Sequence, residues 1–428
     1  MPLYLSDSRS SPPPPTGTGV GRRSAVPGTV LALGAVSLVT DVSSEMVTAI
    51  MPLYLVTGLG LSPLGFGFLD GIYNGAGALV RLLGGHLGDR GGNRHKAVAA
   101  AGYGLSALCK PLLLLVHTGP LIGAVLAVDR TGKGLRTAPR DAMISLATEP
   151  AQRGRAFGVH RAMDTTGALL GPLIAFALLR LAVDGYDAVF AVSGCIAALG
   201  VLILLLFVPG HRGTEPGTAR PSGQERGWRA ALGLLRLRGL RRLTGCAVLL
   251  GLTTVSDSFL YLLIQRRLGL PGHLLPLLPL GTAAAFLVLA VPLGAAADRI
   301  GRRRLFPIGH LLLLVGYGLL LVPLSDGWTG VLPVLVLHGA FYAATDGVLA
   351  AAAADTLPPA QRGTGLALVG TGQALARFTG SLVFGALWSA WGTGIALAIA
   401  TGALAVCTAA AMVVLRLTGS RVTTESAS

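Results

Sequence analysis

Charged residues are scarce in this chain. Only 12% of the 428 residues are Asp, Glu, Lys or Arg, whereas ordinary soluble domains carry about 25%. Apolar residues make up 52%, and the mean hydropathy is +0.68. This composition excludes a large soluble globular protein, because such a protein needs a more charged surface. Most of the chain is therefore expected to lie in lipid.

Cysteine and histidine are few as well, with 4 and 8 residues. The cysteines stand at scattered positions, without a Cys-x-x-Cys pair: Cys109, Cys195, Cys246 and Cys407. This spacing indicates neither a disulfide framework nor a zinc site. A P-loop, a metal triad and a nucleophile–base pairing are also absent from the sequence. We therefore expect no enzyme, no bound metal and no cofactor.

Long apolar runs dominate what is present. Twelve segments are long enough to cross a bilayer as helices of about 20 residues. They cover residues 28–56, 63–88, 97–117, 119–143, 157–181, 187–209, 240–265, 272–297, 304–324, 329–354, 364–389 and 392–416. The sequence thus predicts an all-α membrane protein with twelve transmembrane helices.

The net charge of +15 suggests a nucleic-acid partner, but the placement of the basic residues contradicts it. They gather in the even-numbered connections and the central linker: Arg90, Arg94, Lys96, Arg153, Arg155, Arg212, Arg220, Arg226, Arg229, Arg299, Arg302, Arg303, Arg304 and Arg362. The odd-numbered connections have few, with Arg180, Arg266 and Arg267 at their margins. By the positive-inside rule, the even connections and both termini are cytoplasmic. We therefore expect a multi-pass protein of the cell membrane and no nucleic acid.

The same pattern divides the chain into five parts. They are a disordered cytoplasmic tail (1–26), a bundle of six spans (27–209), a cytoplasmic linker (210–238), a second bundle (239–417) and a short cytoplasmic tail (418–428). Leu and Arg are mixed at helical spacing from Trp228 to Arg242. Such a segment suits the surface of anionic membrane lipids. A simple spacer explains it equally well.

A short basic motif, G-x-x-x-D-R-x-G, occurs twice, at 85–92 and at 294–301. Asp89 and Asp298 differ by 298 − 89 = 209 positions. The segment Pro-Ala-Gln-Arg-Gly also occurs twice, at 150–154 and 359–363, with the same offset. Two motifs at one offset indicate a duplicated unit of about half the chain. Duplicated, highly hydrophobic halves are typical of secondary transporters.

At this motif the chain resembles the major facilitator superfamily, whose loops 2–3 and 8–9 carry G-x-L-a-D-R-x-G-R-K. The resemblance covers nearly the whole chain. It implies two pseudo-symmetric six-helix bundles around a central cavity that opens alternately to each side, and a monomer, as in most relatives. Residues 41–46 and 129–141 resemble a bacterial and archaeal branch. Members of that branch are labelled efflux or drug-resistance permeases.

The resemblance also implies a gate at the cytoplasmic surface. Asp89 and Asp298 are expected to face the starts of the eleventh and fifth helices, which stabilises the cytoplasm-closed state. Asn93 replaces the usual arginine, so Arg90 or Arg94 would have to reach Asp141. The alternative is that these loops only anchor the topology. The gating candidates are Gly85, Asp89, Arg90, Gly92, Asp141, Arg161, Asp164, Gly294, Asp298, Arg299, Gly301 and Arg302.

Ionisable residues inside predicted spans form a second candidate site. Asp129, Lys133, Arg136 and Arg140 are spaced i, i+4, i+7 and i+11, so they share one face of the fourth helix. Arg130 flanks this stripe and resembles the arginine of the superfamily motif R-x-x-Q-G, with Lys133 at the glutamine. Asp41 and Glu45 share a face of the first helix. Helix geometry places Asp41 and Asp129 near mid-depth of the bilayer.

Two interpretations of this charged stripe remain open. In the first, Asp41 and Glu45 neutralise the basic residues when the transporter is empty, and one of them exchanges a proton as cargo binds. In the second, all these charges form a permanent structural network. The fifth helix carries Gly167, Gly171 and Pro172 as G-x-x-x-G-P, which resembles the core of a pattern associated with the superfamily's proton antiporters but lacks its trailing glycine pair.

Other polar positions are weaker candidates. Asp70, Asn74 and Arg81 share one face of the second helix, and Asp257 and Asp346 are isolated in the second half. Arg377 is a possible partner of Asp346, and this half is otherwise expected to form an apolar wall.

The leading functional prediction is a secondary active transporter that exports small organic molecules or drugs in exchange for protons. One alternative is a symporter or exchanger of a small organic anion, because the basic stripe offers cations to carboxylate or phosphate. An alternative of another class is a transporter-like ligand receptor. A receptor would carry a sizeable cytoplasmic signalling domain, and the tail after Arg421 is too short for one.

Overall fold

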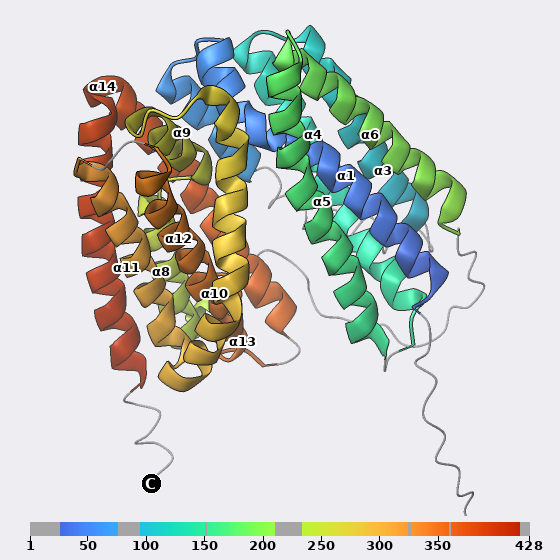
Figure 1. Ribbon diagram of the computed structural model, residues 1–428. Helices are drawn as coiled ribbons and strands as arrows, with labels where there is room; N and C mark the ends of the chain where they lie inside the picture. Colours follow the sequence, from blue (N-terminus) through green and yellow to red (C-terminus); the bar gives the residue numbers. More distant parts are fainter. Residues whose placement is uncertain are drawn as a thin grey trace, which may run out of the picture.

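The computed structural model describes residues 26–75, 95–149, 152–209, 233–323, 327–358 and 361–419. In these ranges the regular elements are helices, arranged as two bundles (Figure 1). Several predicted features lie outside the described residues. They are most of both tails and of the linker 210–238, Arg81, and the first motif copy with Gly85, Asp89, Arg90 and Gly92.

The N-terminal bundle begins with α1 (Gly28–Leu53), which runs into a π-helical turn, η1 (Tyr54–Gly58). Residues 63–75 are helical up to the edge of the described range. The remaining helices are α3 (His95–Leu115), α4 (Gly119–Leu146), α5 (Arg153–Leu181) and α6 (Gly185–Phe207). α1 packs against α5 and α6, and α3 packs against α4 and α6.

The C-terminal bundle contains two helices that are interrupted inside the membrane. Its elements are η3 (Leu234–Arg236), α8 (Arg238–Thr253), α9 (Asp257–Arg267), η4 (Gly272–Leu277), α10 (Leu278–Ile300), α11 (Arg302–Leu321), α12 (Trp328–Thr345), α13 (Val348–Ala354) and α14 (Arg362–Gly419). α8 and α9 together form one span, as do α12 and α13. α14 merges two spans at Gly392, whose φ of 80° is not helical.

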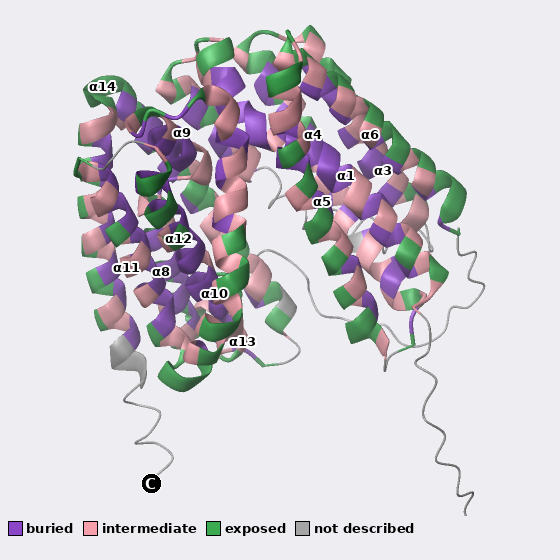
Figure 2. Ribbon diagram, in the orientation of Figure 1, coloured by how far each residue is buried: buried purple, intermediate pink, exposed green. Residues whose placement is uncertain are grey.

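The twelve predicted helices are confirmed. In the described ranges, nine helical segments are long and apolar enough to cross a membrane. These nine segments include α14 as a single segment, and they include neither residues 63–75 nor α4. α14 contains two spans, residues 63–75 begin a further one, and α4 holds too many charged residues to qualify by hydropathy. Large apolar side chains such as Leu287, Val288 and Val291 are exposed, as lipid contact requires, and exposed residues occur along the helices of both bundles (Figure 2).

Helix five lies unusually close to helix one. A Cβ atom at Gly171 would sit 2.7 Å from the carbonyl oxygen of Val42, and one at Gly167 would collide with the backbone of Leu38. Small residues at this spacing let two membrane helices approach to backbone contact. The G-x-x-x-G-P segment therefore positions α5 against the acidic face of α1.

The two bundles touch at one end and diverge at the other (Figure 1). They diverge at the end where α1 begins and α14 finishes. They meet at the opposite end, where η4 packs against α1 and α5. This arrangement positions the polar interior described next.

Candidate functional site

Six side chains from α1, α4 and α5 form a central cluster: Asp41, Glu45, Lys133, Arg136, Arg140 and Asp164. Lys133 Nζ lies 3.9 Å from Asp41 Oδ1 and 3.7 Å from Glu45 Oε1. Arg136 donates a 3.3 Å hydrogen bond to Asp41 Oδ1. The guanidinium of Arg136 also stacks over the ring of Tyr103, 4.4 Å from its centroid. Helices one and four are thus joined by ion pairs at the residues that the sequence singled out.

Arg140 extends the central cluster toward helix five. It pairs with Asp141 at 3.0 Å and with Asp164 at 3.8 Å. The carboxyl group of Asp164 also lies near that of Asp41, but no hydrogen bond joins the two groups and Asp164 Oδ1 has no hydrogen-bond partner among the described residues. The sequence grouped Asp164 with the surface gate, but the structure places it beside Asp41. Asp164 lies near Asp41 because α5 packs closely on α1. Residue spacing along a single helix could not have predicted this contact between two helices.

The central cluster has a buried side and an accessible side. The Arg136 side chain is only 4% exposed, whereas Lys133 and Asp164 are 35% and 30% exposed. α1 and α5 are also the helices that contact α9, α10 and η4 of the other half. The cluster therefore lies on helices that contact the C-terminal half, and Lys133 and Asp164 are its accessible members.

Asp129 belongs to a separate buried group. Its Oδ1 pairs with Lys110 Nζ of α3 at 2.9 Å, and its Oδ2 accepts from Arg130 at 2.9 Å. Ser106 donates to the same carboxylate, and Arg130 covers the ring of Tyr73 at 3.9 Å. Asp129 therefore pairs with Lys110 of α3 and with Arg130, whereas Lys133, Arg136 and Arg140 contact acids of α1, α4 and α5.

The reason for this difference is the crossing of α3 and α4. A Cβ atom at Gly102 would lie 2.7 Å from the carbonyl oxygen of Gly132, so the two backbones are in contact there. This contact brings Lys110 to Asp129 instead of leaving Asp129 opposite α1. A lysine inside the predicted span 97–117 was a sequence signal for such a partner, because an intramembrane cation needs a counter-charge.

The second copy of the gate motif forms contacts within its own half. Arg302, at the start of α11, pairs with Asp298 at 3.5 Å and with Asp355 at 3.2 Å. Gly301, with a φ of 96°, makes the turn between α10 and α11. At the start of helix five, no described residue outside that helix lies within 4 Å of a Cβ added at Gly154, and the ion pair of Asp298 is with Arg302 of its own half. Arg161 and Arg299 are exposed.

At the closed end, the helix of residues 63–75 packs against α14. Ser381 Oγ donates to Asp70 Oδ2 at 2.7 Å, and the Leu64 amide donates to Ser389 Oγ at 2.9 Å. A Cβ at Gly385 would lie 2.5 Å from the carbonyl oxygen of Pro63. Backbone-to-backbone contact between the halves therefore depends on this glycine.

We expect Gly385→Leu to shift the protein away from this closed-end contact, because the new side chain has no space against the Pro63 backbone. Spin labels on the 57–62 and 268–272 connections should report longer distances across the halves. The matched control is Gly402→Leu on the same helix, where no atom lies within 4 Å of the added Cβ. Identical distance distributions for the two variants would contradict the expectation.

In the C-terminal half, Asp257 is not isolated. Its carboxylate accepts from Tyr342 at 2.8 and 2.7 Å and lies 3.1 Å from His338 Nε2. Asp346 and Arg377 line one cavity, but they do not form the ion pair that the sequence suggested. The C-terminal half therefore presents more polar groups than an apolar wall would.

Comparisons with known proteins bear on this arrangement. The family model described as Major Facilitator Superfamily matches residues 33–287 and 253–427. An uncharacterised MFS-type transporter of Methanocaldococcus jannaschii is 28% identical over 369 residues, which are 84% of this chain and 88% of that protein.

Two further similarities are more limited. The multidrug resistance protein MdtH of Photorhabdus laumondii is 28% identical over 186 residues, which are 42% of this chain and 44% of that protein. The crystal structure of the nucleoside transporter NupG aligns with a TM-score of 0.72 at 15% identity, over 90% of this chain and 98% of that one. The second similarity supports the fold alone.

Proposed function

Because this chain belongs to the Major Facilitator Superfamily, we propose that it is a secondary transporter that exchanges protons for a small organic molecule and exports that molecule. The superfamily membership establishes the class of multi-pass membrane transporter. The proton, the direction and the cargo are the proposed part.

The observation that carries the proposal is the position of Asp41. It lies next to Lys133, Arg136 and a second carboxyl group, Asp164. Two adjacent carboxyl groups away from bulk water bind one proton between them more readily than they hold two negative charges. A conformational change that moves α4 or α5 relative to α1 would alter this balance, so proton binding and alternating access are linked.

Charge balance supports a proton carrier over the organic-anion alternative. The ion pairs of the N-terminal half connect five cations, Lys110, Arg130, Lys133, Arg136 and Arg140, with five carboxyl groups, Asp41, Glu45, Asp129, Asp141 and Asp164. Among the described residues of the N-terminal half, the basic stripe is thus matched by acids and leaves no surplus cation within that half. A proton on one carboxyl group would add one positive charge, and its release would restore neutrality.

The end at which the two bundles diverge is compatible with the proposed export. With both termini in the cytoplasm, as the basic connections predict, the diverging ends of the bundles face the cytoplasm. Cargo would then enter the present conformation from inside, as export requires. The partial relative named a multidrug resistance protein is consistent with this direction.

The test is transport in proteoliposomes. Purified protein is first screened by thermal shift against small organic cations, zwitterions and anions, and any stabilising compound is then followed as flux. We expect accumulation to depend on an imposed pH gradient and to collapse when a protonophore is added. Flux that ignores the gradient, or that anions drive by exchange, would reject proton-coupled export.

A further inference from the structure

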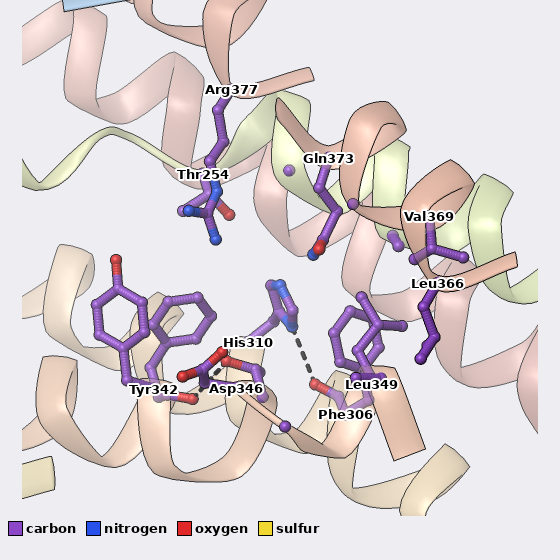
Figure 3. Close-up of a pocket in the computed structure, with 17 residues that line it drawn as sticks. Thr254, Phe306, His310, Tyr342, Asp346, Leu349, Leu366, Val369, Gln373 and Arg377 are labelled. Atoms are coloured by element: carbon purple, nitrogen blue, oxygen red, sulfur yellow. Dashed lines mark hydrogen bonds between the residues drawn. The ribbon is translucent and has the colours of Figure 1, made fainter. Parts of the chain in front are cut away.

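The C-terminal half contains a cavity of about 160 Å³. It lies among α8, α11, α14 and the interruption between α12 and α13 (Figure 3). The interruptions of the two broken spans contribute Thr254 and Asp346 to its wall. Non-helical backbone at membrane depth is tolerated where it is enclosed in protein or lines a cavity. Both interruptions meet that condition here.

One side of the cavity presents hydrogen-bond acceptors. His310 is 4% exposed, and its Nδ1 lies 2.9 Å from the carbonyl oxygen of Phe306. A carbonyl can only accept, so Nδ1 carries the hydrogen and Nε2 is left as an acceptor. Figure 3 shows this ring in the middle of the cavity, above Asp346. Asp346 is exposed and forms no salt bridge with any described residue.

The other side of the cavity presents donors. Arg377 and Gln373 extend from α14 toward the cavity, opposite Asp346 (Figure 3). Neither side chain forms a hydrogen bond or an ion pair with the described part of the protein. The guanidinium and the carboxylate stand on facing walls of the cavity, and both residues are exposed, so both are accessible to a ligand. They do not form an ion pair with each other in this conformation.

Apolar and aromatic side chains complete the cavity. Phe306, Phe341, Leu349, Leu366 and Val369 line it between the two polar sides. Its volume equals the share of roughly five liquid water molecules, at about 30 Å³ each. A compact organic molecule that carries both a cationic and an anionic group matches the acceptors on one wall and the donors on the other.

We propose that this cavity binds a compact amphoteric molecule. Its protonated amine lies at Asp346 and the Nε2 atom of His310, and its carboxylate lies at Arg377 and Gln373. A short apolar body fills the space between the aromatic rings. This inference rests on the proposed transport function, because it identifies the class of cargo for the same protein.

Three probes that share a 3-methylbutyl chain test the proposal. Leucine carries both charged groups, 3-methylbutylamine carries only the amine, and 4-methylpentanoate carries only the acid. Binding to the purified full-length protein is measured by isothermal titration calorimetry. We expect leucine to bind at least tenfold more tightly than either single-charge probe. Equal affinities of leucine and one of the other two would overturn the proposal.

Two variants assign the two ends of the ligand. Asp346→Asn should weaken leucine and the amine at least tenfold and leave the acid unchanged, and Arg377→Gln should weaken leucine and the acid instead. Asp346→Glu should restore much of the amine affinity, which excludes misfolding as the cause. Asp187→Asn, an exposed position on α6, serves as the control. The assignment would be contradicted if every cavity variant lost binding of all three probes, or if no cavity variant lost binding of any probe.

The outcome is separable from the proposed transport function. Cargo from the screen that moves with the pH gradient in both wild type and Asp346→Asn would reject this cavity and retain proton-coupled export. Leucine binding that depends on Asp346, combined with flux that ignores the pH gradient, would reject the coupling and retain the cavity.

Discussion

Replacing Asp41 with Asn is expected to abolish accumulation of cargo driven by a pH gradient, with a loss of more than about tenfold in the rate. The amide cannot exchange a proton with Asp164, and it removes the negative charge that Arg136 contacts at 3.3 Å. Leaving one member of a buried ion pair without its partner costs about 3–5 kcal/mol. The measurement is uptake into proteoliposomes with an imposed pH gradient.

A second readout separates coupling from collapse of the site. Exchange of labelled for unlabelled cargo at equal pH moves no net protons, so Asp41→Asn should retain it. Glu45→Gln is tested in parallel, because Lys133 contacts both carboxyl groups. Asp187→Asn is again the control and should behave as wild type. Unchanged pH-driven uptake in both the Asp41 and the Glu45 variants would leave only a structural role for the central cluster.

Replacing Asp129 with Asn is expected to destabilise the N-terminal half strongly, because two buried cations lose their carboxylate partner. Lys110 and Arg130 both pair with this carboxylate and are only 2% and 8% exposed. Their loss of a partner costs about 3–5 kcal/mol, which corresponds to a fall of roughly 6–20 °C in the unfolding midpoint of a bundle this size. Thermal unfolding of the purified protein in detergent measures it.

A second substitution tests the physical reason. Adding Lys110→Met to Asp129→Asn removes one of the two unpaired cations, so it should recover part of the lost stability. Asp184→Asn, at the exposed start of α6, is the matched control and should leave the midpoint unchanged. A stable Asp129→Asn protein that no longer transports would assign Asp129 to the proton pathway instead.

These two predictions rest on different parts of the stripe that the sequence presented as one. Spacing along α4 put Lys133 and Arg136 on one face, because a helix has a fixed repeat, and both side chains contact Asp41. Spacing could not separate Asp129 from them. That separation depends on the crossing of α3 and α4 at Gly102 and Gly132, which is a property of two helices and not of one.

The same distinction applies to the C-terminal half. Hydropathy predicted the six spans of this half. It did not predict the breaks after Thr253 and Thr345, because the sequence is continuously apolar across both spans. The cavity, with His310 and Asp346 on one side and Arg377 on the other, exists only because four helical segments enclose it. No pairwise spacing in the sequence could have indicated it.

By itself, the sequence determined that most of the chain lies in lipid, how many helices cross the membrane, that the two halves are duplicated, and the family. These properties depend on the apolar content of about 20 successive residues and on repeated motifs, and both are local. The tertiary structure alone decided which charges neutralise one another, that Asp164 lies beside Asp41, and that Asp346 and Arg377 remain apart. Ion pairing in a membrane depends on which helices are neighbours and how they cross, and that information arises only when the whole chain is packed.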